Sequence, residues 1–172
     1  MNILVIILRV LHIVAGISWA GGAIHYFLFI GPTAKATAPE SQKFIGYLMT
    51  QKRWTKFMGA MSLLTILAGG ALYYRLGSVN WGWIATGPGV GFTIGGLAGL
   101  LVFAIGNLLI EPRINDLGKI SREIQANRGS PSAQQAARLS QIQKEMEIIG
   151  KLDFVLILIA VLTMSTARYW SF

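Results

Sequence analysis

The apolar residues of this chain gather in four long stretches that are separated by polar and mostly basic segments. The stretches lie near residues 3–30, 57–74, 90–110 and 154–169. Each is long enough to cross a hydrocarbon core of about 30 Å, which takes roughly 20 helical residues. The pattern therefore predicts an all-α protein, an integral membrane four-helix bundle that forms a single domain over residues 1–172.

The segment between the third and fourth stretches carries apolar residues at helical spacing on both sides of a turn near residues 127–131. They are Ile114, Leu117, Ile120 and Ile124 before the turn, and Ala136, Leu139, Ile142, Met146 and Ile149 after it. We expect the third and fourth helices to extend into a cytoplasmic helical hairpin over about residues 112–150, with Ser130 as an N-cap before Pro131. The hairpin is either a solvated connector or a docking surface for a partner subunit.

Charge is scarce in this chain and unevenly placed. Apolar residues make up 53% and charged residues 13% of the sequence, whereas soluble domains average about 25% charged residues. Of the 15 lysines and arginines, 12 lie in the connections over residues 35–56 and 113–151, while the connection over residues 77–89 has no charge. By the positive-inside rule, the basic connections are cytoplasmic and both termini lie outside, in a multi-pass protein of the bacterial inner membrane.

Several functional classes are excluded or left without support by the composition. The net charge of +8 is explained by membrane orientation, so we expect no nucleic-acid partner. The absence of cysteine excludes disulfides, thiolate metal sites and c-type haem. No nucleotide-binding loop, hydrolase triad or paired-carboxylate site is present, and whether the protein is an enzyme is left open. Because Arg9 interrupts the first apolar stretch and no basic segment precedes it, we expect no cleavable signal peptide.

Ionisable residues inside the first apolar stretch are the strongest functional signal. An arginine within a span costs about 2.5 to 3.5 kcal/mol and is expected to face the bundle interior with a partner. At 100° per residue, Arg9 lies about 60° from His12, and Gly16 and Trp19 lie within about 40° of His12, so the four share one face. His25 is about 140° away around the helix and about 20 Å along its axis, so the two histidines cannot serve one site in one protomer.

This face has the composition of a haem site. An imidazole with a small residue one turn away and an aromatic side chain on the same face suits an axial haem ligand. Arg75 and Arg168 sit at the outer ends of the second and fourth spans, so that with Arg9 they reach the depth at which the propionates of a haem on His12 would emerge. Two other interpretations stay open: a structural polar cluster, with snorkelling arginines and a histidine bonded to a neighbouring helix, or a site for quinone or another ligand.

Further ligands and contacts are less determined by the sequence. A second axial ligand could be Met61, Met164, a histidine of another protomer or a residue of a partner chain, and five-coordinate iron is also possible. His25 is either a packing residue or the ligand of a second haem. A glycine recurs every fourth residue at Gly91, Gly95 and Gly99, which indicates close helix packing within the chain or between protomers, or room for a flat cofactor.

The stretch LHIVAGISWAGG, Leu11 to Gly22, resembles the first span of a superfamily of small haem-associated membrane proteins with the pattern LHxxxxx[ST]WxxG. This group includes the membrane domain of cytochrome-c-linked urate oxidases, the copper-resistance D proteins and the HemJ-type protoporphyrinogen oxidases. The resemblance implies that His12 is a haem ligand. The chain lacks the third-span lysine of the HemJ-type oxidases, the cytochrome domain of the urate oxidases and the external methionines and histidines of the copper proteins.

Two functions therefore follow from the sequence. The first is a b-type haem-binding membrane protein that transfers electrons or serves as a redox subunit, with haem b held by His12. The second is a haem-free accessory subunit of a larger membrane complex. In either case we expect the partners to be the lipid bilayer and further subunits, either copies of this chain or other members of a membrane complex.

The lopsided distribution of basic residues predicts the topology. A protease added outside intact cells should fail to cleave the chain within residues 125–136, and should cleave there after the cells are permeabilised. Cleavage of this segment in intact cells would show that the orientation is reversed.

Overall fold

All regular elements of the described residues are helical. The computed structural model describes residues 3–38, 40–50, 52–77, 81–126 and 130–172. In chain order the elements are α1 (Ile3–His25), the π-helix η1 (Tyr26–Ile30), α2 (Gly31–Ala36), α3 (Ser41–Thr50), α4 (Trp54–Gly77), the 3-10 helix η2 (Trp81–Ala85), α5 (Gly87–Ile105), the π-helix η3 (Gly106–Ile110), α6 (Glu111–Ala126), α7 (Ala133–Thr166) and the 3-10 helix η4 (Ala167–Tyr169).

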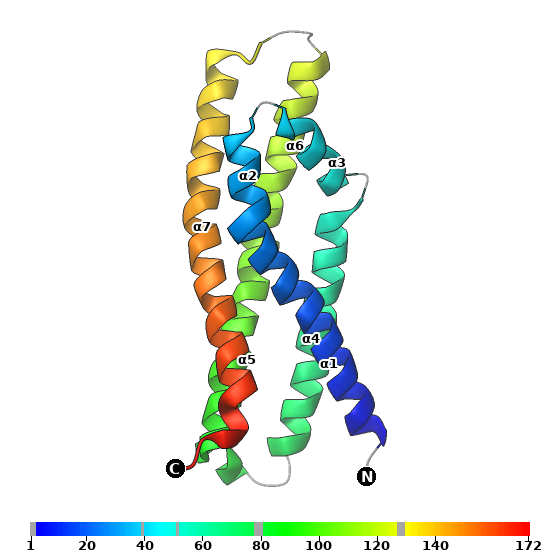
Figure 1. Cartoon of the computed structure of the whole chain (residues 1–172), viewed down its shortest axis with the longest axis vertical. Helices are drawn as coiled ribbons and strands as arrows, with labels where there is room; N and C mark the ends of the chain where they lie inside the picture. Colours follow the sequence, from blue (N-terminus) through cyan, green and yellow to red (C-terminus); the bar gives the residue numbers. More distant parts are fainter. Residues whose placement is uncertain (1–2, 39, 51, 78–80, 127–129) are drawn as a thin grey trace.

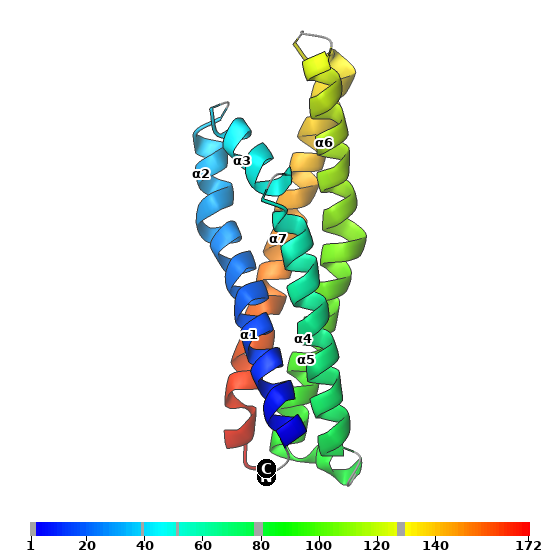
Figure 2. The same ribbon diagram turned by 90° about the vertical axis from the view of Figure 1, so that its right-hand side faces the viewer.

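Four of the continuous helices are long and apolar enough to cross a membrane, which confirms the predicted all-helical chain with four membrane-length helices. They are Ile3–Ala36, Trp54–Arg75, Gly87–Ile124 and Ala133–Tyr169. The start of α1, the end of α4, the start of α5 and the C-terminus lie at one end of the molecule, whereas α2, α3, the end of α6 and the start of α7 lie at the other (Figure 1). Turned by 90°, the molecule shows α6 and α7 reaching beyond α2 and α3 (Figure 2).

Two helices pass through a proline without breaking, and the first of them thereby runs further than the predicted span over residues 3–30. Pro32 and Pro112 both follow a π-helix by two residues, η1 in the first case and η3 in the second. Proline cannot donate a hydrogen bond to the carbonyl four residues earlier, and its ring clashes with that carbonyl. A π-helical turn widens the backbone at this point, so the helix continues: Gly31 N donates to Tyr26 O, and Glu111 N donates to Gly106 O.

The bundle is built from two close helix pairs, α1 with α4 and α5 with α7. In the α5–α7 pair, a Cβ atom on Gly91 would lie 2.7 Å from the Cβ of Ala167, and one on Gly95 would lie 2.6 Å from Cγ of Met164. The packing interpretation of these two glycines is confirmed within the chain, and their space is filled by α7 and η4 rather than by a cofactor. Gly99 lies further along the same face, near Ile66 of α4.

Ion pairs join α6 to the first half of α7. Arg113 Nε donates to Glu145 Oε2 at 2.8 Å, and Arg138 donates to Asp116 at 3.2 Å. Among the apolar residues predicted for this region, Ile142 is fully buried. The part of the predicted turn at residues 127–129 lies outside the described residues.

The start of α7 differs from the prediction by two residues. The N-cap is Ser132 rather than Ser130, because Ser132 forms a reciprocal capping box with Gln135. Gln135 N donates to Ser132 Oγ at 3.2 Å, and Ser132 N donates to Gln135 Oε1 at 3.0 Å. A cap at Ser130 would place Ala133 at the third helical position, where it has no side-chain oxygen to accept the return bond.

The glycine packing makes a matched pair of substitutions informative. Gly95→Ala should destabilise the protein by roughly 1 to 3 kcal/mol, because the added methyl group overlaps Met164 and the Thr163 hydroxyl. Gly96→Ala should leave the stability nearly unchanged, since nothing lies within 4 Å of its Cβ position. Thermal unfolding in detergent compares the two, and equal midpoints would contradict the α5–α7 packing.

Acid should loosen the contact between α6 and α7. The hydrogen bond from Arg113 holds the pKa of Glu145 below its usual range, with a smaller contribution from Gln141. Because the folded-state pKa is lowered, this ion pair contributes stability above the ordinary carboxyl pKa and loses it as the pH falls through the folded-state value. The distance between spin labels on α6 and α7, at Arg122→Cys and Ala137→Cys, should therefore broaden or lengthen at acid pH.

Two glutamate variants separate this ion pair from the general effect of charge. With the labels in place, Glu145→Gln should show the loosened distance at neutral pH and a weaker response to acid. Glu111→Gln removes an equal charge from α6 without touching the Arg113–Glu145 pair, so it should behave as the wild type. An unchanged distance in Glu145→Gln at every pH would show that the pair does not hold the two helices together.

Candidate functional site

His12 is half-buried and points from α1 onto α4. Its Nδ1 lies 2.9 Å from the backbone carbonyl oxygen of Thr65. A carbonyl oxygen can only accept, so Nδ1 carries the hydrogen and donates it, and Nε2 keeps a lone pair. This is the tautomer in which a histidine coordinates a metal through Nε2 while a backbone carbonyl orients the ring.

Gly69 makes this position of the imidazole possible. A Cβ atom at residue 69 would lie 2.7 Å from Cε1 and 2.8 Å from Nδ1 of His12. Real Cβ atoms essentially never come that close to another heavy atom. Thr65 is one helical turn earlier on α4, and its own hydroxyl donates to Met61 O at 2.7 Å, so it does not compete for the imidazole. The sequence reasoning found His12 but missed Gly69, because the register between α1 and α4 is not readable from either helix alone.

Gly16 lies on the same face of α1, as predicted from the helical angle, and this face is covered by α4. A Cβ atom at residue 16 would lie 3.7 Å from Cγ2 of Thr65. The space beside Gly16 is therefore bordered by Thr65. The two α1 residues and the two α4 residues form what we call the His12 clamp: His12 and Gly16 with Thr65 and Gly69.

Trp19 lies about 10 Å from His12 along the axis of α1. It borders a small internal cavity of about 30 Å³ between α1, α5 and α7, together with Ala20, Gly99, Val102, Ile157, Ala160 and Val161. The cavity is far too small for a porphyrin and is not lined by His12, so it is not the place of a haem on that residue.

All three arginines of the predicted site are exposed and belong to the half of the molecule that contains both termini. Arg9 precedes His12 by about 4.5 Å along α1, and Arg75 in the last turn of α4 follows Gly69 by about 9 Å. Arg168 lies in η4, after the end of α7. The three arginines thus lie on three different elements toward the same end of the molecule.

His25 lies far from the His12 clamp. Its Nδ1 is 2.7 Å from Gly21 O on the same helix, and its ring centroid is 6.1 Å from that of Phe29. Of the two methionines considered as second ligands, Met164 packs against Gly95 of α5, and Met61 contributes its carbonyl to Thr65. Among the described residues, no group of three or more His, Cys, Asp or Glu side chains comes together. A b-type haem takes only one or two axial ligands and needs no such group.

Asp153 is a polar residue that the sequence reasoning missed. Its Oδ1 is buried and has no hydrogen-bond partner within the described part of the chain. The next residue, Phe154, stacks on Phe27 of η1 with ring centroids 4.6 Å apart, and a Cβ atom at residue 150 would lie 3.6 Å from the same Phe27 ring. The available signal was an acidic residue at the start of an apolar run with no basic residue three or four positions away.

In comparisons with known proteins, no family model, no curated protein and no solved structure matches this chain.

Proposed function

We propose that this chain is an integral membrane protein that binds b-type haem through His12 and serves in electron transfer or as a redox subunit. The observation that carries the proposal is the His12 clamp, in which Thr65 O holds Nδ1–H and leaves Nε2 as a ligand. The motif from Leu11 to Gly22 adds the resemblance to the superfamily of small haem-associated membrane proteins. When bound, haem b supplies one-electron redox chemistry.

The residues around the clamp have separate roles in this proposal. Arg9, Arg75 and Arg168 supply positive charge for the propionates, at the depth of the His12 ring or closer to the termini. Gly16 and Gly69 allow α1 and α4 to approach, and Trp19 packs inside the bundle on the same helix face as His12. His25 remains a candidate for a second haem. In this proposal the porphyrin would lie against α1 at His12, beside lipid or a second protomer.

The orientation and the cytoplasmic hairpin belong to the same proposal. Both termini and the three arginines would face the outside of a bacterial inner membrane, and the paired ends of α6 and α7 would form a cytoplasmic hairpin. The basic residues of that hairpin and of residues 35–56 support this orientation. A redox partner or a further subunit would then meet the hairpin on the cytoplasmic side.

The alternative is a haem-free accessory subunit of a larger membrane complex. One observation favours it: the cavity of about 30 Å³ between α1, α5 and α7 is too small for a porphyrin and is not lined by His12. In that case the bond between His12 and Thr65 O is a structural link between two spans. A reduced-minus-oxidised absorption spectrum of the purified protein separates the two functions.

Substitutions at the clamp test the haem proposal. His12→Ala should remove the Soret band while the protein stays in the membrane, whereas His25→Ala should keep most of it. Gly69→Ala should weaken haem binding by about 10- to 100-fold, the usual effect of disturbing a group that orients a metal ligand. Gly70→Ala is the matched control, because nothing lies within 4 Å of its Cβ position.

Each outcome bears on one of the two functions. A wild-type protein that shows no Soret absorbance after expression with ample haem would overturn the haem proposal and leave the accessory subunit. A Soret band that survives His12→Ala but is lost in His25→Ala would move the haem to the other half of the membrane. Size-exclusion profiles of the variants distinguish lost haem from lost fold.

A further inference from the structure

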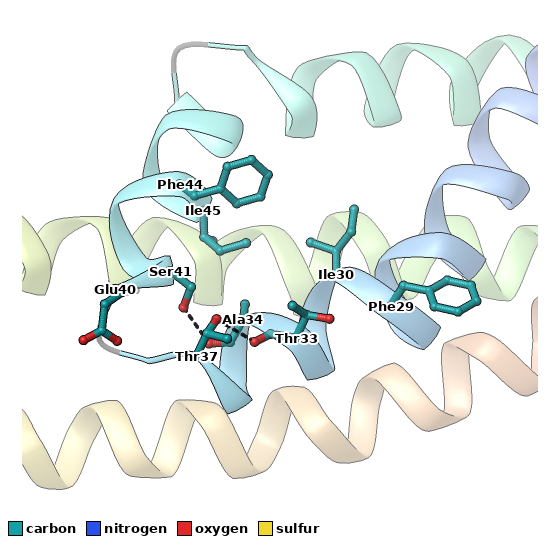
Figure 3. Close-up of a pocket in the computed structure, with 9 residues that line it drawn as sticks. All are labelled: Phe29, Ile30, Thr33, Ala34, Thr37, Glu40, Ser41, Phe44 and Ile45. Carbon is teal, nitrogen blue, oxygen red and sulfur yellow. Dashed lines mark hydrogen bonds between the residues drawn. The ribbon is translucent and has the colours of Figure 1, made fainter.

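An open groove of about 490 Å³ lies between the end of the first span and α3, far from the His12 clamp. Its lining comes from η1, α2, α3 and the connection between α2 and α3: Phe29, Ile30, Thr33, Ala34, Thr37, Glu40, Ser41, Phe44 and Ile45. Figure 3 shows Ile30, Phe44 and Ile45 at the apolar part of the groove and Thr37, Glu40 and Ser41 at its other end.

The groove has few polar groups free to bind a polar ligand. Ser41 Oγ donates to Ala34 O at 2.6 Å, and Thr37 Oγ1 donates to Thr33 O at 2.8 Å. These hydroxyls are therefore already hydrogen-bonded to the helix that carries the groove. What remains is a slot lined mainly by carbon, which suits an alkyl chain better than a polar molecule.

The position of the groove along the membrane normal is set by the length of the first helix. The continuous helix Ile3–Ala36 has 34 residues, or about 51 Å at 1.5 Å per residue, against a hydrocarbon core of about 30 Å. The helix is thus longer than the hydrocarbon core is thick, so its last residues cannot lie within the core. The groove, which is lined by residues at this far end of the helix, therefore lies near the boundary between hydrocarbon and headgroups. Exposed aromatic side chains mark the same level, with Phe29 and Phe44 each 62% exposed and Tyr47 56% exposed.

Basic residues surround α3 in excess. Between residues 31 and 56 the sequence has one acidic residue, Glu40, and five basic ones, Lys35, Lys43, Lys52, Arg53 and Lys56. Lys35 is paired with Glu147 of α7 at 3.5 Å. Lys43 on α3 and Lys52, Arg53 and Lys56 just after it are exposed, and the Lys52 ammonium lies 5.9 Å from the centroid of the Tyr47 ring.

We propose that this groove binds an anionic phospholipid of the adjacent leaflet, with one acyl chain between α2 and α3 and the phosphate drawn to Lys43, Lys52 and Arg53. The apolar slot suits the acyl chain, and its position near the headgroup boundary suits the glycerol region. The excess positive charge suits the phosphate. Glu40 opposes the headgroup charge and thereby limits the affinity. The proposal does not depend on haem.

The test uses the full-length protein in detergent, titrated with phosphatidylglycerol and with phosphatidylcholine of identical acyl chains, with bound lipids counted by native mass spectrometry. Phosphatidylglycerol should bind more tightly. The double variant Lys43→Gln and Lys52→Gln should bind it roughly 30-fold more weakly, as expected for the loss of two surface charges. Lys119→Gln on α6 is the control and should change nothing.

Two further variants examine the groove itself. Glu40→Gln should tighten phosphatidylglycerol binding by removing the like charge, and Ala34→Trp should abolish the binding of both lipids by filling the slot. Equal binding of the two lipids, or binding that survives Ala34→Trp, would overturn the proposal. Competition by inorganic phosphate as effective as that by phosphatidylglycerol would also overturn it, because the acyl chain would then contribute nothing.

Discussion

Close approach of helix backbones at glycine and alanine positions is the constraint on which the other features of this structure depend. Lipid offers no hydrophobic force between helices, so spans associate through tight van der Waals packing. Gly91 and Gly95 bring α5 against Ala167 and Met164, while Gly16 and Gly69 bring α1 against α4. The imidazole of His12 reaches a backbone carbonyl of α4 only because this approach is so close. The same close approach of α1 and α4 therefore both packs the helices and orients the His12 imidazole.

Much of the fold could be predicted from the chain because its causes are local. Four apolar stretches of sufficient length specify four spans, and the glycines at every fourth residue of α5 indicate a packing face. Where the prediction failed, the cause was a competing local interaction. The sequence ended the first span near Ile30, whereas a π-helical turn carries this helix past Pro32. The reciprocal bonds of Ser132 and Gln135 likewise moved the start of α7.

The candidate site was only half readable from the sequence. The angular positions of His12 and Gly16 around α1 follow from their spacing in the sequence, so the prediction that they share one face of α1 was correct. The partner of His12 is determined by how α1 and α4 are placed against each other, which depends on many side chains at once. Asp153 was missed for a similar reason: the burial of its Oδ1 depends on how the helices pack, and its own neighbours in sequence do not reveal it.

The two π-helices have a consequence for how the chain tolerates changes in length. A π-helical turn holds one residue more than the α-helical turn it replaces, so the helix faces before and after it are rotated by about 100° relative to an uninterrupted helix. In the first span this rotation lets one face meet α4 through His12 while Phe27 meets α7. Loss of a single residue within η1 or η3 would remove the π-helical turn and rotate the far half of the helix by about 100°. It would also leave Pro32 or Pro112 inside an α-helical stretch, where the ring clashes with the carbonyl four residues earlier. The length of these two short segments therefore matters both for the direction of the far half and for the passage through the proline.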